Sequence, residues 1–223
     1  MVTVKVMRAV NEENDLVATE VRQMLADYRV VALNLMSSPG SGKTSLLERT
    51  LDRMGGEWRF GAIVGDLFTT RDADRLAARG VPVVQLNTEG SCHLTAHMIR
   101  ESLQEFDKDA LDCLFIENVG NLVCPGGFDL GEDYRIAVLS TTEGGDKVEK
   151  YPRVFRQASA SVITKTDLLE YLDFDLADVI AHLQLLNPEA PVFPLSTKTG
   201  EGMEDWCTWL RDLLAGAAST SGV

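Results

Sequence analysis

Residue types that bind phosphate stand together in segment 38–44, which reads Ser-Pro-Gly-Ser-Gly-Lys-Thr. Its glycines let the backbone wrap around phosphate oxygens with the N–H groups turned inward. Lys43 can then reach the β- and γ-phosphates of a nucleoside triphosphate, and the Thr44 hydroxyl can contact Mg²⁺. Ser37 stands where the usual pattern G-x-x-x-x-G-K-[ST] has its first glycine. We expect phosphate binding by Pro39, Gly40, Ser41, Gly42, Lys43, Thr44 and Ser45; the alternative is a glycine-rich turn that only caps a helix.

Two later segments have the residue types that select a base. Thr164-Lys165-Thr166-Asp167 follows an apolar run and resembles the N/T-K-x-D element of GTPases. A carboxylate there accepts hydrogen bonds from the ring N–H and the exocyclic amine of guanine, a donor pair that adenine lacks. Ser196-Thr197-Lys198 resembles the S-A-K element, whose backbone meets the guanine carbonyl. Either segment alone could be a strand-to-turn junction, but together behind a phosphate loop they predict guanine binding by Thr164, Lys165, Asp167, Ser196, Thr197 and Lys198.

Two carboxylates end apolar runs and are candidates for the reaction centre. Glu117-Asn118-Val119-Gly120 stands where GTPases carry D-x-x-G, which predicts a carboxylate near Mg²⁺ and the Gly120 amide near the γ-phosphate. Asp66 ends an earlier run and could hold Mg²⁺, orient the attacking water, or only cap the next helix. We predict Thr44, Asp66 and Glu117 as magnesium ligands and Lys43, Asp66 and Glu117 as catalytic residues. No arginine can be assigned to the transition state, so we expect slow unaided hydrolysis.

A second kind of chemistry is indicated by Cys92-His93 and Cys124, each of which follows a predicted strand. His97 follows His93 by one helical turn and would share its helix face. Thiolate and imidazole suit Zn²⁺ and Ni²⁺ rather than Mg²⁺ or Ca²⁺. Singly, such cysteines are usually buried hydrophobes and such histidines incidental surface groups. Their grouping predicts a nickel or zinc site of Cys92, His93, His97 and Cys124, which a twofold dimer could share.

The elements that position these residues alternate along the chain. Apolar runs that suit buried strands lie at 30–36, 59–64, 81–86, 113–117, 135–139, 161–164 and 192–195. Helical patterns lie at 11–28, 44–54, 71–78, 94–106, 176–186 and 203–214. This order predicts an α/β fold, a single-domain P-loop NTPase with a mostly parallel sheet and helices on both faces. In such sheets ligands bind at the carboxyl ends of the strands, where every motif above lies.

Domain organisation and composition are those of one globular unit. We expect a helical extension at 1–28 packed on the core, the GTPase domain with its metal site at 29–214, and a flexible tail at 215–223. Acidic residues outnumber basic ones 34 to 21, which argues against nucleic acid or an anionic membrane as a partner. No apolar run approaches the ~18 residues of a membrane helix. The absence of a signal-peptide pattern and four cysteines without framework spacing predict a cytoplasmic protein.

Taken together, these motifs resemble the nickel-incorporation GTPase of [NiFe]-hydrogenase maturation, the HypB family, from about Val30 to Leu214. The most specific part is Cys92-His93 combined with Glu117-Asn118-Val119-Gly120-Asn121-Leu122-Val123-Cys124-Pro125. The resemblance implies a Mg²⁺-dependent GTPase that cycles between GTP and GDP, dimerises with GTP and delivers nickel to the hydrogenase large-subunit precursor. It also implies a HypA-type accessory partner and metal binding by Cys92, His93 and Cys124, with His97 sometimes participating. Segment 1–28 has no Cys or His, so we do not expect nickel storage.

Two other functions compete with this interpretation. One is the urease-activating GTPase, in which the metal pair is usually a Cys-Pro-His unit that this sequence lacks. The other is a metal-binding scaffold whose nucleotide site does not catalyse. Cys124 follows Gly120 closely, so we hypothesise that GTP and GDP states differ in dimer contact and metal affinity.

Overall fold

The computed structural model describes residues 5–67, 69–88 and 90–219, in which seven strands form one parallel sheet. The strands are β1 (Val31–Ser37), β2 (Phe60–Asp66), β3 (Val83–Asn87), β4 (Cys113–Glu117), β5 (Tyr134–Ser140), β6 (Ala160–Thr164) and β7 (Val192–Pro194). Their order is β3-β2-β4-β1-β5-β6-β7, and every neighbouring pair is parallel. The predicted α/β fold is confirmed, and its sheet is wholly rather than mostly parallel.

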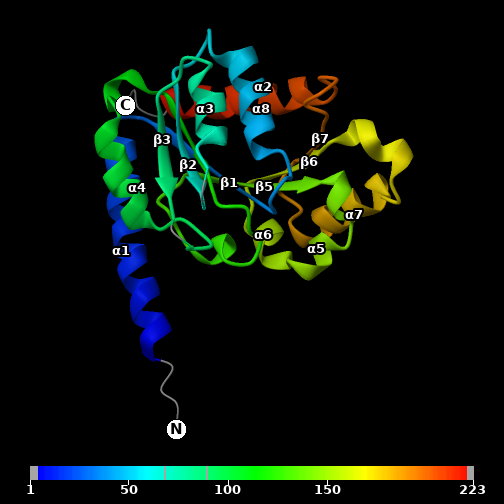
Figure 1. Ribbon diagram of the computed structural model, residues 1–223, viewed down its shortest axis with the longest axis horizontal. Coiled ribbons are helices and arrows are strands. Elements are labelled where there is room, and N and C mark those ends of the chain that lie inside the picture. Colours follow the sequence, from blue (N-terminus) through cyan, green and yellow to red (C-terminus); the bar gives the residue numbers. More distant parts are fainter. Residues whose placement is uncertain (1–4, 68, 89, 220–223) are drawn as a thin grey trace.

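Helices cover both faces of the sheet (Figure 1). They are α1 (Lys5–Asp27), α2 (Lys43–Met54), α3 (Arg71–Ala77), α4 (Ala96–Ser102), α5 (Lys147–Lys150), α6 (Pro152–Arg156), α7 (Leu176–Leu186) and α8 (Met203–Ser219). Alternate strand residues face opposite ways, so Leu33 and Leu35 pack with α2 and α8, whereas Ala32 and Met36 face the other helices. No helix of the described segments is long and apolar enough to cross a membrane.

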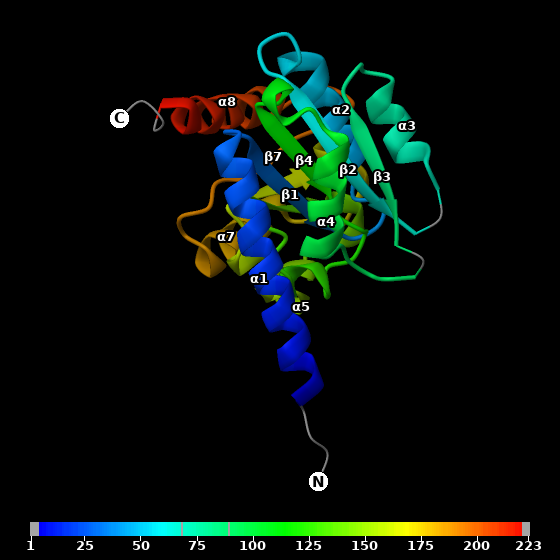
Figure 2. The same ribbon diagram turned by 90° about the vertical axis from the view of Figure 1, so that its left-hand side faces the viewer.

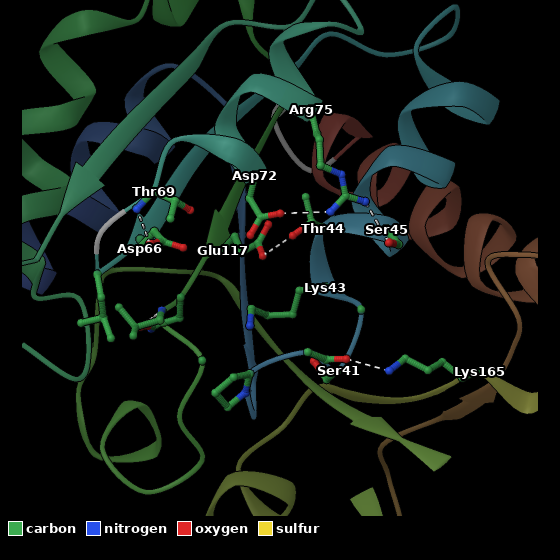
Figure 3. Close-up of a pocket in the computed structure, with 18 residues that line it drawn as sticks. Ser41, Lys43, Thr44, Ser45, Asp66, Thr69, Asp72, Arg75, Glu117 and Lys165 are labelled. Atoms are coloured by element: carbon green, nitrogen blue, oxygen red, sulfur yellow. Dashed lines mark hydrogen bonds and ion pairs between the residues drawn. The ribbon is translucent and has the colours of Figure 1, made fainter. Parts of the chain in front are cut away.

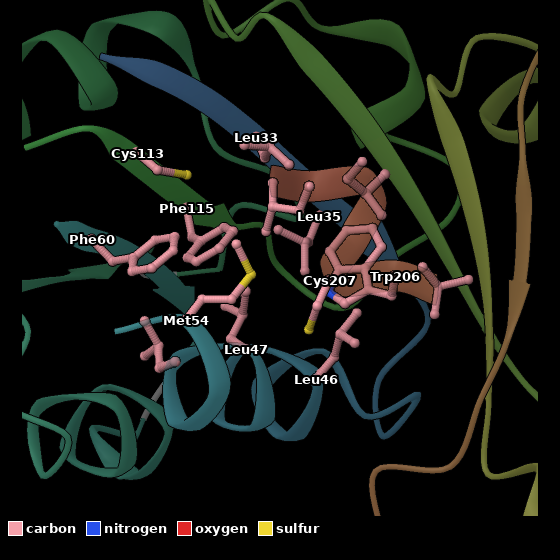
Figure 4. Close-up of a cluster of buried hydrophobic side chains, with 14 of the residues drawn as sticks. Leu33, Leu35, Leu46, Leu47, Met54, Phe60, Cys113, Phe115, Trp206 and Cys207 are labelled. Carbon is pink, nitrogen blue, oxygen red and sulfur yellow. The ribbon is translucent and has the colours of Figure 1, made fainter. Parts of the chain in front are cut away.

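The core beneath α2 and α8 contains two of the four cysteines (Figure 4). Cys113 and Cys207 are both buried there, as expected for structural residues. Trp206 is fully buried, and its Nε1 donates to Thr50 Oγ1 at 2.9 Å, which fastens α8 to α2. This helix continues to Ser219, so 215–219 is helical rather than the predicted flexible tail. The rest of that predicted tail, 220–223, lies outside the described residues.

The predicted helix 94–106 is shorter in the structure. Thr95 is the N-cap of α4, because its side chain accepts from Met98 N at 3.4 Å, and the helix begins at Ala96. A 3₁₀ turn, Leu103–Glu105, follows it. Cys92 and His93 therefore lie in a loop before the helix, and His93 does not share a helix face with His97. The short helices α5 and α6 were not predicted, because a few residues are too short to show a period.

The N-terminal helix α1 runs beside α4 (Figure 2). Val17, Val21 and Leu25 share one helix face and enter a buried cluster with α4. Gly131 forms a close contact on this helix, since a Cβ there would lie 2.6 Å from both Ala18 O and Val21 Cβ. Its φ of +84° is also unfavourable for any other residue. The α1 helix thus packs directly against the backbone at Gly131.

We predict that Gly131→Ala lowers the free energy of unfolding by about 2–4 kcal/mol, through positive-φ strain and the collision with α1. Urea unfolding measures it. Gly216→Ala is the matched control, because Gly216 lies in α8 with nothing within 4 Å of an added Cβ. That variant should gain about 0.5–1 kcal/mol from helix propensity. Equal stability of Gly131→Ala and the unsubstituted protein would contradict the packing of α1.

Candidate functional site

A cavity of about 540 Å³ lies at the carboxyl ends of the central strands (Figure 3). Its wall is formed by the loop after β1, the ends of β2 and β4, the start of α3, and Lys165. The structure thereby brings together many of the sequence-predicted residues: Pro39, Gly40, Ser41, Gly42, Lys43, Thr44, Ser45, Asp66, Glu117, Gly120 and Lys165. Residues distant in sequence meet here because parallel strands present their carboxyl ends at one edge.

The loop after β1 has the conformation that its glycines permit. Gly40 and Gly42 have φ of 75° and 94°, and Gly42 is the N-cap of α2. Lys43 is buried, and its Nζ donates to Ser37 Oγ at 2.8 Å, while Ser41 Oγ donates to the same oxygen at 2.5 Å. Burial lowers the pKa of Lys43, although nearby carboxylates, Glu117 first, oppose the shift. Ser37, which replaces the first glycine of the usual pattern, thus accepts hydrogen bonds from Lys43 and Ser41, and the pattern alone did not reveal these contacts.

The Glu117 carboxylate is the most unusual group in the cavity. Its Oε1 accepts from Thr44 Oγ1 at 2.7 Å, but Oε2 is buried and has no hydrogen-bond partner. Burial raises the pKa of Glu117 to about 7, against the opposing effects of the Lys43 charge and the Thr44 hydrogen bond. A buried, unsatisfied carboxylate oxygen is costly, and such groups occur where a cation or ligand is bound.

Asp66 lies on the cavity wall at the end of β2. Its Oδ1 accepts from Thr69 N at 2.8 Å, before α3 begins at Arg71. The carboxylate therefore stabilises the turn into α3, and the N-cap residue of that helix is Thr70.

Two cavity residues on α3, Asp72 and Arg75, were not predicted from the sequence. Arg75 Nη1 donates to Asp72 Oδ1 at 3.0 Å, and Nη2 donates to Ser45 Oγ at 3.0 Å. The same guanidinium pairs with Glu48 on α2. The i, i+3 spacing of Asp72 and Arg75 on one helix face was the available signal. An arginine of this chain thus borders the cavity, held by three partners.

The segment after β4 lies directly on the phosphate loop. A Cβ on Gly120 would come within 2.8 Å of Pro39 Cα and 2.9 Å of Pro39 N. Only glycine allows so close an approach of two backbones. A change in the conformation of the phosphate loop would therefore also displace the segment that leads to Cys124.

The two predicted base-recognition segments also come together beside the loop. Thr164 Oγ1 donates to Ser41 O at 2.6 Å, and Lys165 Nζ donates to Gly40 O at 2.7 Å. The threonine that stands in place of asparagine thus fastens the phosphate loop through its hydroxyl.

Asp167 is held by the S-A-K-like segment. Its Oδ1 accepts from Ser196 Oγ at 2.6 Å, and its Oδ2 lies 3.9 Å from Lys198 Nζ. Thr197 contributes its carbonyl oxygen, which accepts from Arg49 Nε at 2.9 Å.

Three of the four predicted metal-binding residues, Cys92, His93 and Cys124, lie together and form what we call the soft-ligand cluster. The ligand atoms of Cys92, His93 and Cys124 all lie within 4.8 Å of one another, the one such group found among the described residues. The two sulfurs are 2.8 Å apart, and Cys92 Sγ lies 3.5 Å from His93 Nδ1. The hydrogen bond to Cys124 raises the pKa of Cys92, and burial lowers the pKa of His93, which favours the neutral imidazole. Neutral imidazole is the form that binds metals.

His97 is not part of this cluster. It is exposed on α4, and its Nδ1 lies 3.2 Å from Arg100 Nη2. Phe128 instead packs on His93, with ring centroids 3.9 Å apart and an interplanar angle of 25°. No role for Phe128 was predicted from the sequence, because no spacing rule pointed to it.

Comparison with known proteins identifies relatives of the whole arrangement. The family model described as "CobW/HypB/UreG, nucleotide-binding domain" matches residues 31–194. The hydrogenase maturation factor HypB of Azotobacter vinelandii is 48% identical over 199 residues, which cover 89% of this chain and 66% of that protein. The chain thus spans about two thirds of the length of that relative.

A sequence and a solved structure from Helicobacter pylori show the same relationship to HypB. A hydrogenase/urease maturation factor HypB is 43% identical over 213 residues, covering 94% of this chain and 87% of that protein. A crystal structure of HypB from the same organism in complex with nickel superimposes with a TM-score of 0.86 at 42% identity, covering 92% and 96% of the two chains. With a family model over most of its length and relatives of this similarity, the chain belongs to the HypB members of the CobW/HypB/UreG family.

Proposed function

We propose that the protein hydrolyses GTP with Mg²⁺ and uses its nucleotide state to control the delivery of nickel to a [NiFe]-hydrogenase large-subunit precursor. One observation carries this proposal: the segment from Glu117 to Cys124 connects the nucleotide cavity to the soft-ligand cluster. An interaction of that segment with a nucleotide therefore reaches a metal ligand through a few residues of backbone.

The phosphates are held by the loop after β1. The backbone N–H groups of 39–45 and the N-terminus of α2 supply a positive dipole, and Lys43 adds a full charge. To meet a phosphate, Lys43 Nζ exchanges its bond to Ser37 Oγ for one to a phosphate oxygen. Gly120 lies against Pro39 in the phosphate loop, which supports the proposal that its amide senses the γ-phosphate.

Mg²⁺ fits the residues at the end of β4. The unsatisfied Oε2 of Glu117 and the Thr44 hydroxyl are hard oxygen ligands, and Asp66 faces them across the cavity. When bound, the ion neutralises charge on the transferred phosphoryl group. Asp66 and Asp72 both line the cavity and would orient a water molecule, and Arg75 is the nearby cation.

Guanine is selected by the segments after β6 and β7. Asp167 accepts from the base, Ser196 and Lys198 hold its carboxylate, and the Lys165 stem lies along the ring. Thr164 and the backbone of Ser196–Lys198 complete this side of the site.

Nickel is the cargo of the soft-ligand cluster. Cys92, His93 and Cys124 supply three ligands, and a second copy of the chain completes the shell in a GTP-promoted homodimer. The nickel complex of the H. pylori relative supports this metal, and Zn²⁺ is the competing ion. Because that organism's relative is named a hydrogenase/urease maturation factor, urease is a second candidate for receiving the nickel. A HypA-type accessory protein is the proposed partner.

Lys43→Ala should lower GTP turnover by about 100-fold or more, because the charge that meets the β- and γ-phosphates is lost. Phosphate release measures turnover, and equilibrium titration measures Ni²⁺ binding, which should stay within about twofold. Lys150→Ala is the control, since this lysine pairs with Asp146 on the surface. Turnover that survives in Lys43→Ala would favour a metal-binding scaffold with a non-catalytic nucleotide site.

Cys92→Ala and Cys124→Ala should each weaken Ni²⁺ and Zn²⁺ binding by more than about 100-fold, since each removes a ligand. Cys207→Ala controls for loss of a thiol elsewhere, because Cys207 is buried in the core. His97→Ala should leave affinity unchanged, because His97 lies beside Arg100 instead. Unchanged metal stoichiometry in both ligand variants would overturn the assignment of the cluster.

Glu117→Gln should change how stability depends on pH. Between pH 4.5 and about 7 the folded protein keeps a proton on Glu117 that the unfolded chain has lost. This group therefore makes the free energy of unfolding fall as pH rises through that range, by on the order of 2–3 kcal/mol. Glutamine has no such proton, so the difference in stability between the two proteins should change by that amount.

Urea unfolding in EDTA, without nucleotide, at several pH values across that range measures this difference. The buried Glu132 and the half-buried Glu143 also have raised pKa values, but they are common to both proteins and cancel. Parallel pH profiles for the two proteins would show that Glu117 ionises normally.

A further inference from the structure

The residue after His93 contacts the nucleotide side of the molecule. Leu94 is fully buried, and its N–H donates to Asn118 Oδ1 at 3.2 Å. Asn118 directly follows Glu117 and lines the cavity. One hydrogen bond therefore joins the backbone that carries Cys92 and His93 to the end of β4.

The Leu94 side chain makes a second, independent contact. A Cβ on Gly65 would lie 2.9 Å from Leu94 Cδ2 and 3.0 Å from its Cγ, so the leucine rests against the Gly65 backbone. Gly65 directly precedes Asp66. Leu94 thus touches both strand ends that carry the cavity carboxylates, Asp66 and Glu117.

The residues on both sides of Leu94 are fixed by hydrogen bonds. Asn118 Nδ2 donates to Asn34 Oδ1 at 3.2 Å, and Asn118 N donates to Leu35 O at 3.1 Å. On the other side, Ala96 N donates to Asn14 Oδ1 on α1 at 3.0 Å. Because this segment is anchored at Ala96, a displacement of Leu94 passes to the His93 end. Close-packed interiors transmit such shifts rather than absorb them.

We propose that Leu94 is the positioning residue through which the nucleotide cavity sets the geometry of the Cys92 and His93 ligands. This inference rests on the proposed function and adds a route to it. The route through Gly120 leads to Cys124 and, through Asn121 Nδ2, which donates to Cys92 O at 3.4 Å, also meets the Cys92 backbone, whereas Leu94 reaches His93 from the opposite side along the chain. A nucleotide that shifts Asp66 or Glu117 moves Gly65 or Asn118, and the buried leucine carries that shift to His93.

The test compares Ni²⁺ dissociation constants measured with GDP and with a non-hydrolysable GTP analogue. We expect a ratio of about fivefold or more in the unsubstituted protein, as is typical of coupled sites. In Leu94→Ala the ratio should fall to within about twofold of one. Leu94→Val, which lacks the Cδ atoms that meet Gly65, should reduce it with a smaller loss of stability.

Leu103→Ala is the matched control, because Leu103 is an equally buried leucine of the same cluster. It should keep the ratio of the unsubstituted protein, and thermal unfolding verifies that all variants are folded. An unchanged ratio in both Leu94 variants, or its loss in Leu103→Ala as well, would overturn the role of Leu94 alone. A ratio of one in the unsubstituted protein would overturn nucleotide control itself, and the Leu94 route with it.

Discussion

The pairing of β1 with β4 is the contact on which the site depends. Its register sets Leu35 opposite Glu117, so the two strands end side by side. The phosphate loop follows β1, and the segment that leads to Cys124 follows β4. The hydrogen bond between Thr44 and Glu117 closes this junction, and the contact of Gly120 with Pro39 makes it tight. Without this register the residues of the nucleotide cavity and those of the soft-ligand cluster would not be neighbours.

Two buried glutamates show how the proposed ion ligand differs from a carboxylate whose oxygens are all hydrogen-bonded within the protein. Burial raises the pKa of both Glu117 and Glu132. The oxygens of Glu132, however, accept from Asn34, Leu130 N and Arg135. Those of Glu117 have one partner, Thr44, and Oε2 has none. The raised pKa therefore does not distinguish these two glutamates, whereas the unsatisfied oxygen of Glu117 does. Glu143 Oε1 is also buried without a partner, so it is the position of Glu117 in the cavity, beside Thr44, that favours it as the proposed ion ligand.

The soft-ligand cluster depends on two segments that leave the sheet on either side of β2. Cys92 and His93 follow β3 at the edge, and Cys124 follows β4. Both segments are supported from α1, since Asn14 accepts from Ala96 N and donates to Asp129 O at 2.8 Å. Arg22 on the same helix pairs with Asp129, next to the Phe128 ring that stacks on His93. The N-terminal helix is thus part of the support of the two segments that carry the proposed metal ligands.

The sequence by itself determined the parallel α/β fold, the phosphate loop and the edge at which the motifs meet, because these follow from local patterns and strand order. Only the tertiary structure decided which side chains meet. It separated His97 from His93, because the Thr95 cap starts the helix after His93. It also supplied Arg75, Phe128 and the Leu94 contacts, and extended α8 to Ser219. The contacts of Arg75 with Glu48, of Phe128 with His93 and of Leu94 with Gly65 join residues that are distant along the chain, so no local period encodes them.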